Sequence, residues 1–369
     1  MPADTLHDIT IRGFKSIASI EKLKLNPINI VIGANGSGKS NFIGAFAFLR
    51  EVGVGRLRDY VKNAGGADKV LHFGSKTTER IDVGITSNYG GYGGHPSPSA
   101  YNLTLLASAD DGLFPSREEL HLSAYPPTSL GEYQRELEAG IGNPASEGVT
   151  KGLRQTLDLW RVYHLHDTSY MRKAANIHDK RFLRADGSNL PAFLYDLREK
   201  WPDYYNLIVA AVQQVSPFFD NFDLNPDGNS GSIQLVWRHR KSDQFFNASS
   251  LSDGTLRFIA LATLFLQPEM YRRSLVLVDE PELGLHPYAI ELLASLIHRA
   301  SVNTQVIVST QSSLLLDHFE PKDILVADRV DGGTQLTRPD SERLEKWLED
   351  YSLGQLWEKN ELGGRPAPV

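Results

Sequence analysis

The chain has 369 residues, no cysteine and a net charge of −7 at pH 7, and its length accommodates one large α/β domain with an insertion, or two domains. The lack of cysteine excludes disulfides and cysteine-ligated metals, and with no signal-like pattern at the N-terminus it leads us to expect a cytoplasmic protein. The negative charge argues against indiscriminate nucleic-acid binding, and the longest apolar run is far below the ~20 residues of a membrane span, so we expect no membrane partner.

The first fifty residues predict a β-hairpin, a strand and a helix. Residues 6–25 have the pattern of two antiparallel strands, and isoleucines alternate again at 28–32. The apolar side chains of residues 41–50 fall on one face of a helix. Between this strand and this helix lies GANGSGKS, residues 33–40, which fits the pattern G-x-x-x-x-G-K-[ST] in the context that the motif requires.

This glycine-rich loop predicts a site for a nucleotide and Mg²⁺. Its glycines let the backbone turn tightly, so that N–H groups point at phosphate oxygens, and the helix adds the positive end of its dipole. Lys39 is expected to reach the β- and γ-phosphates, and Ser40 to hold Mg²⁺ through its hydroxyl. The alternative, a glycine-rich turn without a ligand, does not account for the flanking strand and helix. The predicted nucleotide-binding residues are Gly33, Asn35, Gly36, Ser37, Gly38, Lys39, Ser40 and Asn41.

The middle of the chain predicts strands followed by helices. Residues 80–125 are rich in strand-like segments, interrupted by a glycine-rich surface loop at 90–99. Residues 128–220 are mainly helical by pattern, without the persistent heptads of a long coiled coil. The helical segments within them are 156–166, 190–200 and 203–215.

Part of this helical region is strongly basic. Residues 151–184 contain eight lysines or arginines and three aspartates, a local net charge of +5, with aromatic residues interleaved. The pattern is compatible with a nucleic-acid face, which makes DNA a candidate partner, and equally with a solvated helical surface. His164 and His166 lie two residues apart, which is poor spacing for a shared metal on a helix, and we interpret both as structural.

The C-terminal part of the chain predicts a buried parallel sheet. From residue 233 to residue 330, apolar strand-like segments alternate with helical ones. We therefore expect three regions. They are an N-terminal lobe with the phosphate loop at 1–127, a mainly helical insertion at 128–225 and a C-terminal lobe at 226–369.

Two acids follow the apolar strand at residues 274–278. Acids at the carboxyl end of a parallel strand lie where α/β sheets bind ligands. Asp279 can hold Mg²⁺ through water, and Glu280 can orient and polarise the attacking water; the alternative is two acids at an ordinary strand end. Upstream, Ser252 and Gly254 of LSDGT precede a helix, which predicts either a second anion site or a simple helix N-cap.

The order of the phosphate loop, LSDGT, DEPELGLHP and STQSS resembles the ABC-type ATPase heads of the SMC, RecF and OLD class. More closely, the chain resembles the bacterial AAA-15/AAA-21 ATPases. The segments that carry this likeness are ITIRGFKSI at 9–17, LRADGSNLPAFLYDL at 183–197 and WLEDYSLGQLWEKNELGGRP at 347–366. The resemblance implies an α/β fold: an ABC/RecF-like P-loop NTPase head with mixed and parallel sheets and a helical insertion.

The resemblance also implies an ATP-dependent, head-to-head homodimer with two ATP molecules between the heads. The phosphate loop and Asp279–Glu280 of one chain would face Ser252 and Gly254 of the other. ATP would hold the two heads together, and hydrolysis would release them. Arg12, in the segment that resembles the family's opening strand, is a further candidate for binding nucleotide, with an exposed strand residue as the alternative.

Two positions depart from the family pattern. Asp253 brings a negative charge to the signature, which would weaken a phosphate site. Gln311 stands where a histidine often contacts the γ-phosphate. Since an amide hydrogen-bonds phosphate but cannot become cationic, we expect slow hydrolysis.

These features together predict a Mg²⁺-dependent ATPase that converts ATP to ADP and phosphate, with Lys39, Glu280 and Gln311 as its catalytic residues. We expect a DNA-associated or partner-controlling switch in genome maintenance or antiphage defence. The alternative is a nucleotide-sensing subunit that hydrolyses little and regulates a separate effector protein. A transporter ATPase is disfavoured, because the sequence lacks LSGGQ.

Overall fold

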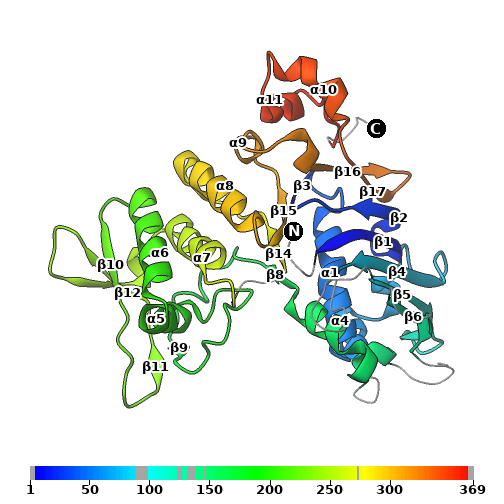
Figure 1. Ribbon diagram of the computed structural model, residues 1–369, viewed down its shortest axis with the longest axis horizontal. Helices are drawn as coiled ribbons and strands as arrows, with labels where there is room; N and C mark the ends of the chain where they lie inside the picture. Colours follow the sequence, from blue (N-terminus) through cyan, green and yellow to red (C-terminus); the bar gives the residue numbers. More distant parts are fainter. Residues whose placement is uncertain are drawn as a thin grey trace.

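The computed structural model describes residues 5–88, 99–122, 127–130, 138–143, 147–271 and 274–364, without the side chains of residues 147–149. It has a central sheet between a large antiparallel sheet on one side and a helical lobe on the other (Figure 1). None of the helices among these residues is long and apolar enough to cross a membrane.

The central sheet has six strands in the order β17-β16-β3-β15-β14-β8. The strands from β16 to β8 are parallel, and β17 pairs antiparallel with β16 at the edge. Every residue of β3, β14 and β15 is buried, as expected for parallel strands covered on both faces. The bounds are β3 Ile28–Ile32, β8 Arg161–Tyr163, β14 Leu275–Asp279, β15 Gln305–Thr310, β16 Ile324–Val330 and β17 Gly333–Thr337.

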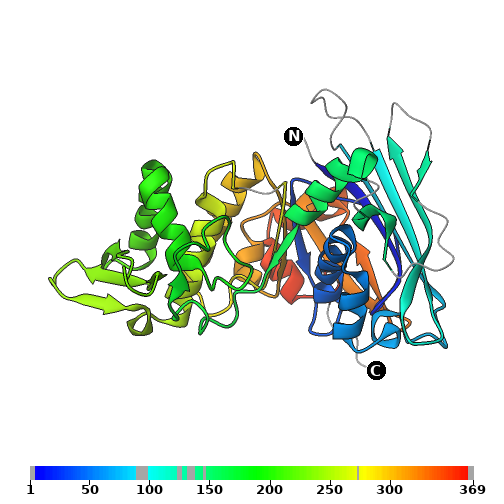
Figure 2. The ribbon, with the colours of Figure 1, turned by 90° about the horizontal axis from the view of Figure 1, so that it is seen from below.

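The antiparallel sheet packs over helix α1, Lys39–Gly53, which lies between the two sheets (Figure 2). Phe42 and Phe46 of α1 share one buried core with Ile9 of the antiparallel sheet and Leu277 of the central sheet. Of the predicted surface loop, residues 90–98 lie outside the described part of the chain. The strands of this sheet are β1 Leu6–Phe14, β2 Ile17–Lys24, β4 Arg80–Ser87, β5 Ser99–Ala107, β6 Leu113–Leu122 and β7 Thr128–Ser129. The helices beside it are α2 Leu57–Ala64, α3 Ala67–Val70 and α4 Glu147–Leu159.

A second core covers the opposite face of the central sheet and continues into the helical lobe. Helix α7, Asp253–Leu266, is buried over almost its whole length because apolar residues occupy all its faces. The other helices on this side are α5 Leu190–Lys200, α6 Pro202–Val215 and α8 Pro287–Ser301. The small strands of the lobe are β9 Ala175–Asn176, β10 Phe219–Asp223, β11 Ser232–Ile233, β12 Val236–His239 and β13 Phe245–Asn247. The chain closes with α9 Ser313–Leu316, α10 Ser341–Leu348 and α11 Leu353–Glu358.

These layers confirm the predicted fold class, whereas the predicted helix at 156–166 is wrong in its second half. Helix α4 ends at Leu159, and the chain continues as strand β8, which pairs parallel with β14. Val162 and Tyr163 of this strand, and Leu165 after it, are buried. β-Branched and aromatic residues favour a strand when a neighbouring strand is available, and local periodicity does not contain that information. The three predicted domain boundaries stay predictions.

Candidate nucleotide site at the carboxyl edge of the central sheet

The phosphate loop joins β3 to α1, and all three of its glycines have positive φ angles. Gly36 has a φ of 79° and Gly38 a φ of 102°. A side chain at Gly38 would place its Cβ 1.9 Å from Thr334 Oγ1, so only glycine fits. A Cβ at Gly36 would meet nothing within 4 Å, so the loop is open on that side. The loop therefore has a supported inner side and an accessible outer side.

Lys39, the first residue of α1, folds back over this loop. Its ammonium donates hydrogen bonds to the carbonyls of Gly33, at 2.7 Å, and Ala34, at 3.0 Å. Burial lowers the pKa of Lys39, and the negative charges of Glu280, Asp279 and Glu282 oppose that shift. The structure thus brings Lys39 within electrostatic range of both predicted acids. The next residue, Ser40, is exposed.

The loop is held from behind by residues that the sequence did not single out. Thr334 Oγ1 donates to the carbonyl of Ser37 at 2.8 Å and is 2.7 Å from Ser16 Oγ, which also accepts from Asn41 Nδ2. The backbone N–H of Ala34 donates to the carbonyl of Gly364 at 2.6 Å. Ser16 and Gly364 belong to two of the segments quoted above for their likeness to the family. Nothing in the sequence around Thr334 indicates that it supports the phosphate loop.

The two predicted acids lie at the end of β14, where Asp279 is the last residue of the strand and Glu280 follows it, and the neighbouring strand constrains both. Asp279 is 8% exposed and accepts a hydrogen bond from Ser309 of β15. Glu280 has a φ of 43°, and its N–H donates to the carbonyl of Ser309 at 2.9 Å. A left-handed backbone costs a non-glycine residue on the order of 1 kcal/mol and is often found at functional sites. Gln311 donates from Nε2 to Glu280 Oε1, so the structure places these two predicted catalytic side chains together.

Glu282 is a third acid at this edge that the sequence analysis did not single out. It accepts hydrogen bonds from Thr310 Oγ1, at 2.6 Å, and from the N–H of Gln311, at 3.1 Å. Its other oxygen, Oε2, is buried without a hydrogen-bond partner in the described part of the chain. Burial raises the pKa of Glu282. The loop after β14 is therefore tied to the loop after β15 through a carboxyl group that is poorly solvated.

The start of α7 is held by its own chain. Ser252 Oγ accepts a hydrogen bond from Thr255 N at 3.1 Å, so this serine caps the helix. A Cβ on Gly254 would lie 2.2 Å from the carbonyl oxygen of Gly284, which requires glycine for close packing. Within the described chain, neither Ser252 nor Gly254 hydrogen-bonds to the phosphate loop of the same molecule.

The charge of Asp253 is balanced locally. The hydrogen bond from Thr168, and then the one from Arg172, lower the pKa of Asp253. The Arg172 Nη2 atom lies 2.7 Å from Asp253 Oδ1, and the same guanidinium donates to the carbonyls of Ala248 and Leu251. The negative charge that was expected to weaken a phosphate site therefore has a cation beside it.

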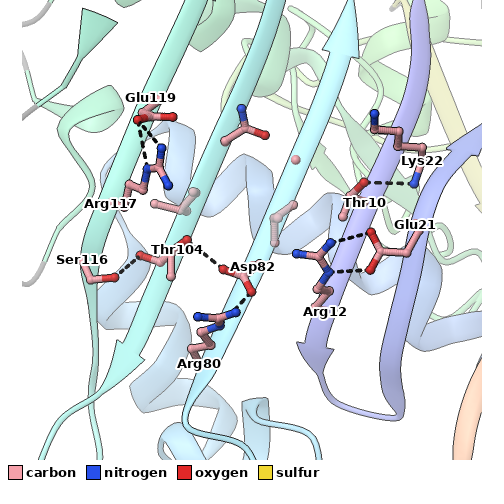
Figure 3. Close-up of a pocket in the computed structure, with 14 residues that line it drawn as sticks. Thr10, Arg12, Glu21, Lys22, Arg80, Asp82, Thr104, Ser116, Arg117 and Glu119 are labelled. Atoms are coloured by element: carbon pink, nitrogen blue, oxygen red, sulfur yellow. Dashed lines mark hydrogen bonds and ion pairs between the residues drawn. The ribbon is translucent and has the colours of Figure 1, made fainter. Parts of the chain in front are cut away.

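Arg12 lies on the outer face of the antiparallel sheet, as Figure 3 shows. Its guanidinium makes two hydrogen bonds to the carboxylate of Glu21, at 2.5 and 2.7 Å. This pair lines a polar surface groove of about 620 Å³ together with Arg80, Asp82 and Arg117. The structure does not bring Arg12 into the cluster around Lys39, and its predicted contact with nucleotide stays a prediction.

Comparisons with known proteins agree with this geometry. Residues 28–317 match the family model described as "AAA domain, putative AbiEii toxin, Type IV TA system". One similar solved structure is an SMC head bound to the C-winged helix domain of ScpA, with a TM-score of 0.64 and 17% identity over 92% of this chain and 99% of that one. Another is the Smc head domain with an extended coiled coil, bound to the C-terminal domain of ScpA and derived from Pyrococcus furiosus, with a TM-score of 0.60 and 16% identity over 94% and 99%. No curated protein matches the sequence. At these identities the structural likeness shows the fold, that of an ABC-type ATPase head.

Proposed function

Because the chain belongs to this family of AAA domains, we propose that it is a Mg²⁺-dependent ATPase that converts ATP and water to ADP and phosphate. The observation that carries the proposal is the gathering of Lys39, Asp279, Glu280 and Gln311 at one edge of the central sheet. Phosphoryl transfer needs chiefly positioning and charge stabilisation, and these groups supply both.

Binding of ATP would begin at the phosphate loop. The open side at Gly36 would admit the phosphates, and Lys39 would exchange its two carbonyl partners for phosphate oxygens. Ser40, which is exposed, and Asp279, whose Oδ2 makes no hydrogen bond in the described chain, fit as the residues that hold Mg²⁺. The ion would supply positive charge to the phosphates.

Hydrolysis would then use Glu280 as the general base. A water molecule attacks the γ-phosphorus, its proton passes to Glu280, and the bond between this phosphorus and the bridging oxygen of ADP breaks. Gln311 holds Glu280 through its amide N–H, which fixes the base and leaves the amide near the reacting phosphate. The left-handed backbone of Glu280 supports this role, because the neighbouring strand maintains a conformation that costs energy.

We further propose that two copies associate head to head when ATP is bound. Ser252 and Gly254 make no hydrogen bond to the phosphate loop of their own chain, which leaves the start of α7 available to a second molecule. The positive end of the α7 dipole and Arg172 give this surface a favourable field for phosphate, despite Asp253. ATP would then complete a composite site and hold the two heads together.

Of the two cellular roles, the structure favours control of a partner protein over DNA association. Much of the basic segment is engaged within the chain. Arg172 pairs with Asp253, Lys180 lies 3.3 Å from a carboxylate oxygen of Asp196, and Arg184 pairs with Asp179. Both solved heads described above are bound to a domain of another protein. We therefore propose an ATP-controlled switch for an effector protein, in genome maintenance or antiphage defence.

The variant Glu280→Gln tests this function. We expect ATP affinity near that of wild type, a decrease in kcat of roughly 10²-fold or more, and an ATP-dependent dimer that persists on size exclusion. The matched control is Glu291→Gln, on the exposed face of α8, which is expected to retain the wild-type rate. If neither wild type nor Glu280→Gln releases phosphate while both bind ATP, the sensor alternative replaces the ATPase. An unchanged rate in Glu280→Gln would exclude this general base.

A further inference from the structure

Directly after β8 the chain presents two histidines around one buried leucine. Leu165, between them, is buried in the core. His164 and His166 are both exposed. The poor metal spacing inferred for a helix therefore does not apply, because this segment is not helical.

A buried arginine fixes the backbone that carries these imidazoles. Arg257 of α7 donates to the carbonyl of Leu165 at 2.9 Å and to the carbonyl of His166 at 3.0 Å. The N–H of His164 donates to the carbonyl of Ala185 at 3.0 Å. The backbone is thus held on both sides, while the two imidazole rings are exposed.

Strand pairing brings the first histidine to the level of Asp279. Strands β8 and β14 are neighbours in the central sheet (Figure 1). In their parallel register Tyr163 lies opposite Val278, so His164 and Asp279 are the next residues of the two chains. His164 Nδ1 is 3.6 Å from Asp279 Oδ2, which is too long for a hydrogen bond. Ser309 binds the other carboxylate oxygen, which leaves Oδ2 directed at the imidazole. One ligand atom from each of His164, His166 and Asp279 lies within 4.8 Å of the other two.

We propose that His164, His166 and Asp279 form a binding site for a first-row divalent transition metal ion such as Mn²⁺ or Zn²⁺. The two imidazole nitrogens suit Zn²⁺, and the carboxylate with bound water suits Mn²⁺, whereas Mg²⁺ prefers oxygen ligands only and retains its water. Metal–ligand bonds of about 2.0–2.2 Å hold the donor atoms roughly 3–4 Å apart, so small rotations of the exposed rings close the site. Three protein ligands leave further positions for water or for a phosphate oxygen.

This site goes beyond the ATPase proposed above, because the metal binds without nucleotide. It shares Asp279 with the phosphate site, and it adds two ligands that the phosphate loop does not contain. The two histidines would thus select the identity of the ion at this edge of the sheet. They are positioned by β8 and α7, not by the loop that binds phosphate.

The test uses the untagged full-length protein and Mn²⁺ alone, without nucleotide. Titration followed by electron paramagnetic resonance reports free hydrated Mn²⁺ directly, and we expect one bound ion per chain. Pulsed measurements on the bound ion should show nitrogen couplings from imidazole. His164→Ala and His166→Ala should each weaken binding at least ~10-fold. The exposed His178→Ala is the matched control and should bind as wild type.

Two results would overturn the proposal. The first is that the wild-type protein binds no Mn²⁺, or that its bound Mn²⁺ shows no nitrogen coupling. The other is a doubly substituted His164→Ala, His166→Ala protein that binds Mn²⁺ as tightly as His178→Ala. The result on wild type needs no variant, so misfolding cannot obscure it. ATP binding in the presence of Mg²⁺, measured on the same proteins, tests the proposed ATPase separately.

Discussion

The phosphate-loop side of the site and the start of α7 satisfy their polar groups in opposite ways. On the first side, Lys39 has only two backbone carbonyls as partners, and one oxygen of Glu282 is buried without a partner in the described chain. At α7, Ser252 caps its own helix, Asp253 is paired with Arg172, and Gly254 packs closely against Gly284. One side holds groups that a ligand would satisfy, whereas the other is already complete.

This difference indicates different roles in the same reaction. Groups that exchange weak internal partners for a charged ligand gain free energy on binding, and they respond strongly to substitution. A surface that is already satisfied binds as a rigid unit, and it contributes through its shape and its field. We therefore expect the phosphate-loop side to control affinity for nucleotide, and the α7 side to control association of two chains.

The largest effect is expected from a substitution in the phosphate loop, and it tests whether this side controls affinity for nucleotide. Lys39→Ala removes the cation, and we expect ATP affinity to fall by roughly 100-fold or more, measured by titration calorimetry or with a fluorescent analogue. Lys62→Ala, an exposed lysine of α2, is the control and should leave affinity unchanged. If Lys39→Ala binds ATP like the control, the two sides do not differ in the way described.

Local sequence predicted the phosphate-loop side well. The strand at 28–32, the loop and the helix are contiguous, and their geometry depends on glycines and periodicity that a short window contains. Asp279 and Glu280 could also be predicted from local sequence, because a buried apolar strand leads directly into them. The placement of Lys39 near both acids followed from the family pattern and from the parallel sheet.

The remaining parts of the site depend on contacts between distant segments. β8 forms a strand because β14 is available as a neighbour. The chain that follows β8 brings ligand atoms of His164 and His166 within 4.8 Å of one from Asp279. Thr334 supports the phosphate loop across 297 residues of sequence. Gly254 lies in a segment with the pattern of an anion site, yet a Cβ added there would lie 2.2 Å from the carbonyl oxygen of Gly284 of the same chain. No local pattern encodes such approaches, since they are properties of the assembled sheet.

A second variant tests whether the α7 surface acts as a rigid unit. Gly254→Ala would place a methyl group 2.2 Å from the carbonyl oxygen of Gly284. We expect an overpacking cost of roughly 1–3 kcal/mol, a lower unfolding midpoint, and loss of the ATP-dependent dimer. ATP affinity of the monomer should stay within about 2-fold of wild type.

Gly228→Ala is the matched control, because a Cβ there meets nothing within 4 Å. It should dimerise with ATP and unfold like wild type. Retention of the dimer in Gly254→Ala, with an unfolding midpoint equal to that of Gly228→Ala, would show that this surface is not rigid. It would also remove Gly254 from the proposed composite site.

The smallest effect concerns the unsatisfied carboxyl group on the phosphate-loop side. Burial raises the pKa of Glu282 above its ordinary value of 4.5, so the folded protein favours the protonated form. The stability from that form is complete below the ordinary pKa and is lost as pH rises through the raised one. Glu282→Gln keeps a hydrogen-bond acceptor for Thr310 and removes the charge. We therefore expect the variant to unfold at a higher temperature than wild type. The difference in unfolding midpoint should grow to roughly 1–3 °C as pH rises from about 5 to about 8. Glu291→Gln should follow wild type, and a gap for Glu282→Gln that is constant with pH would show that the buried carboxyl group is not the source.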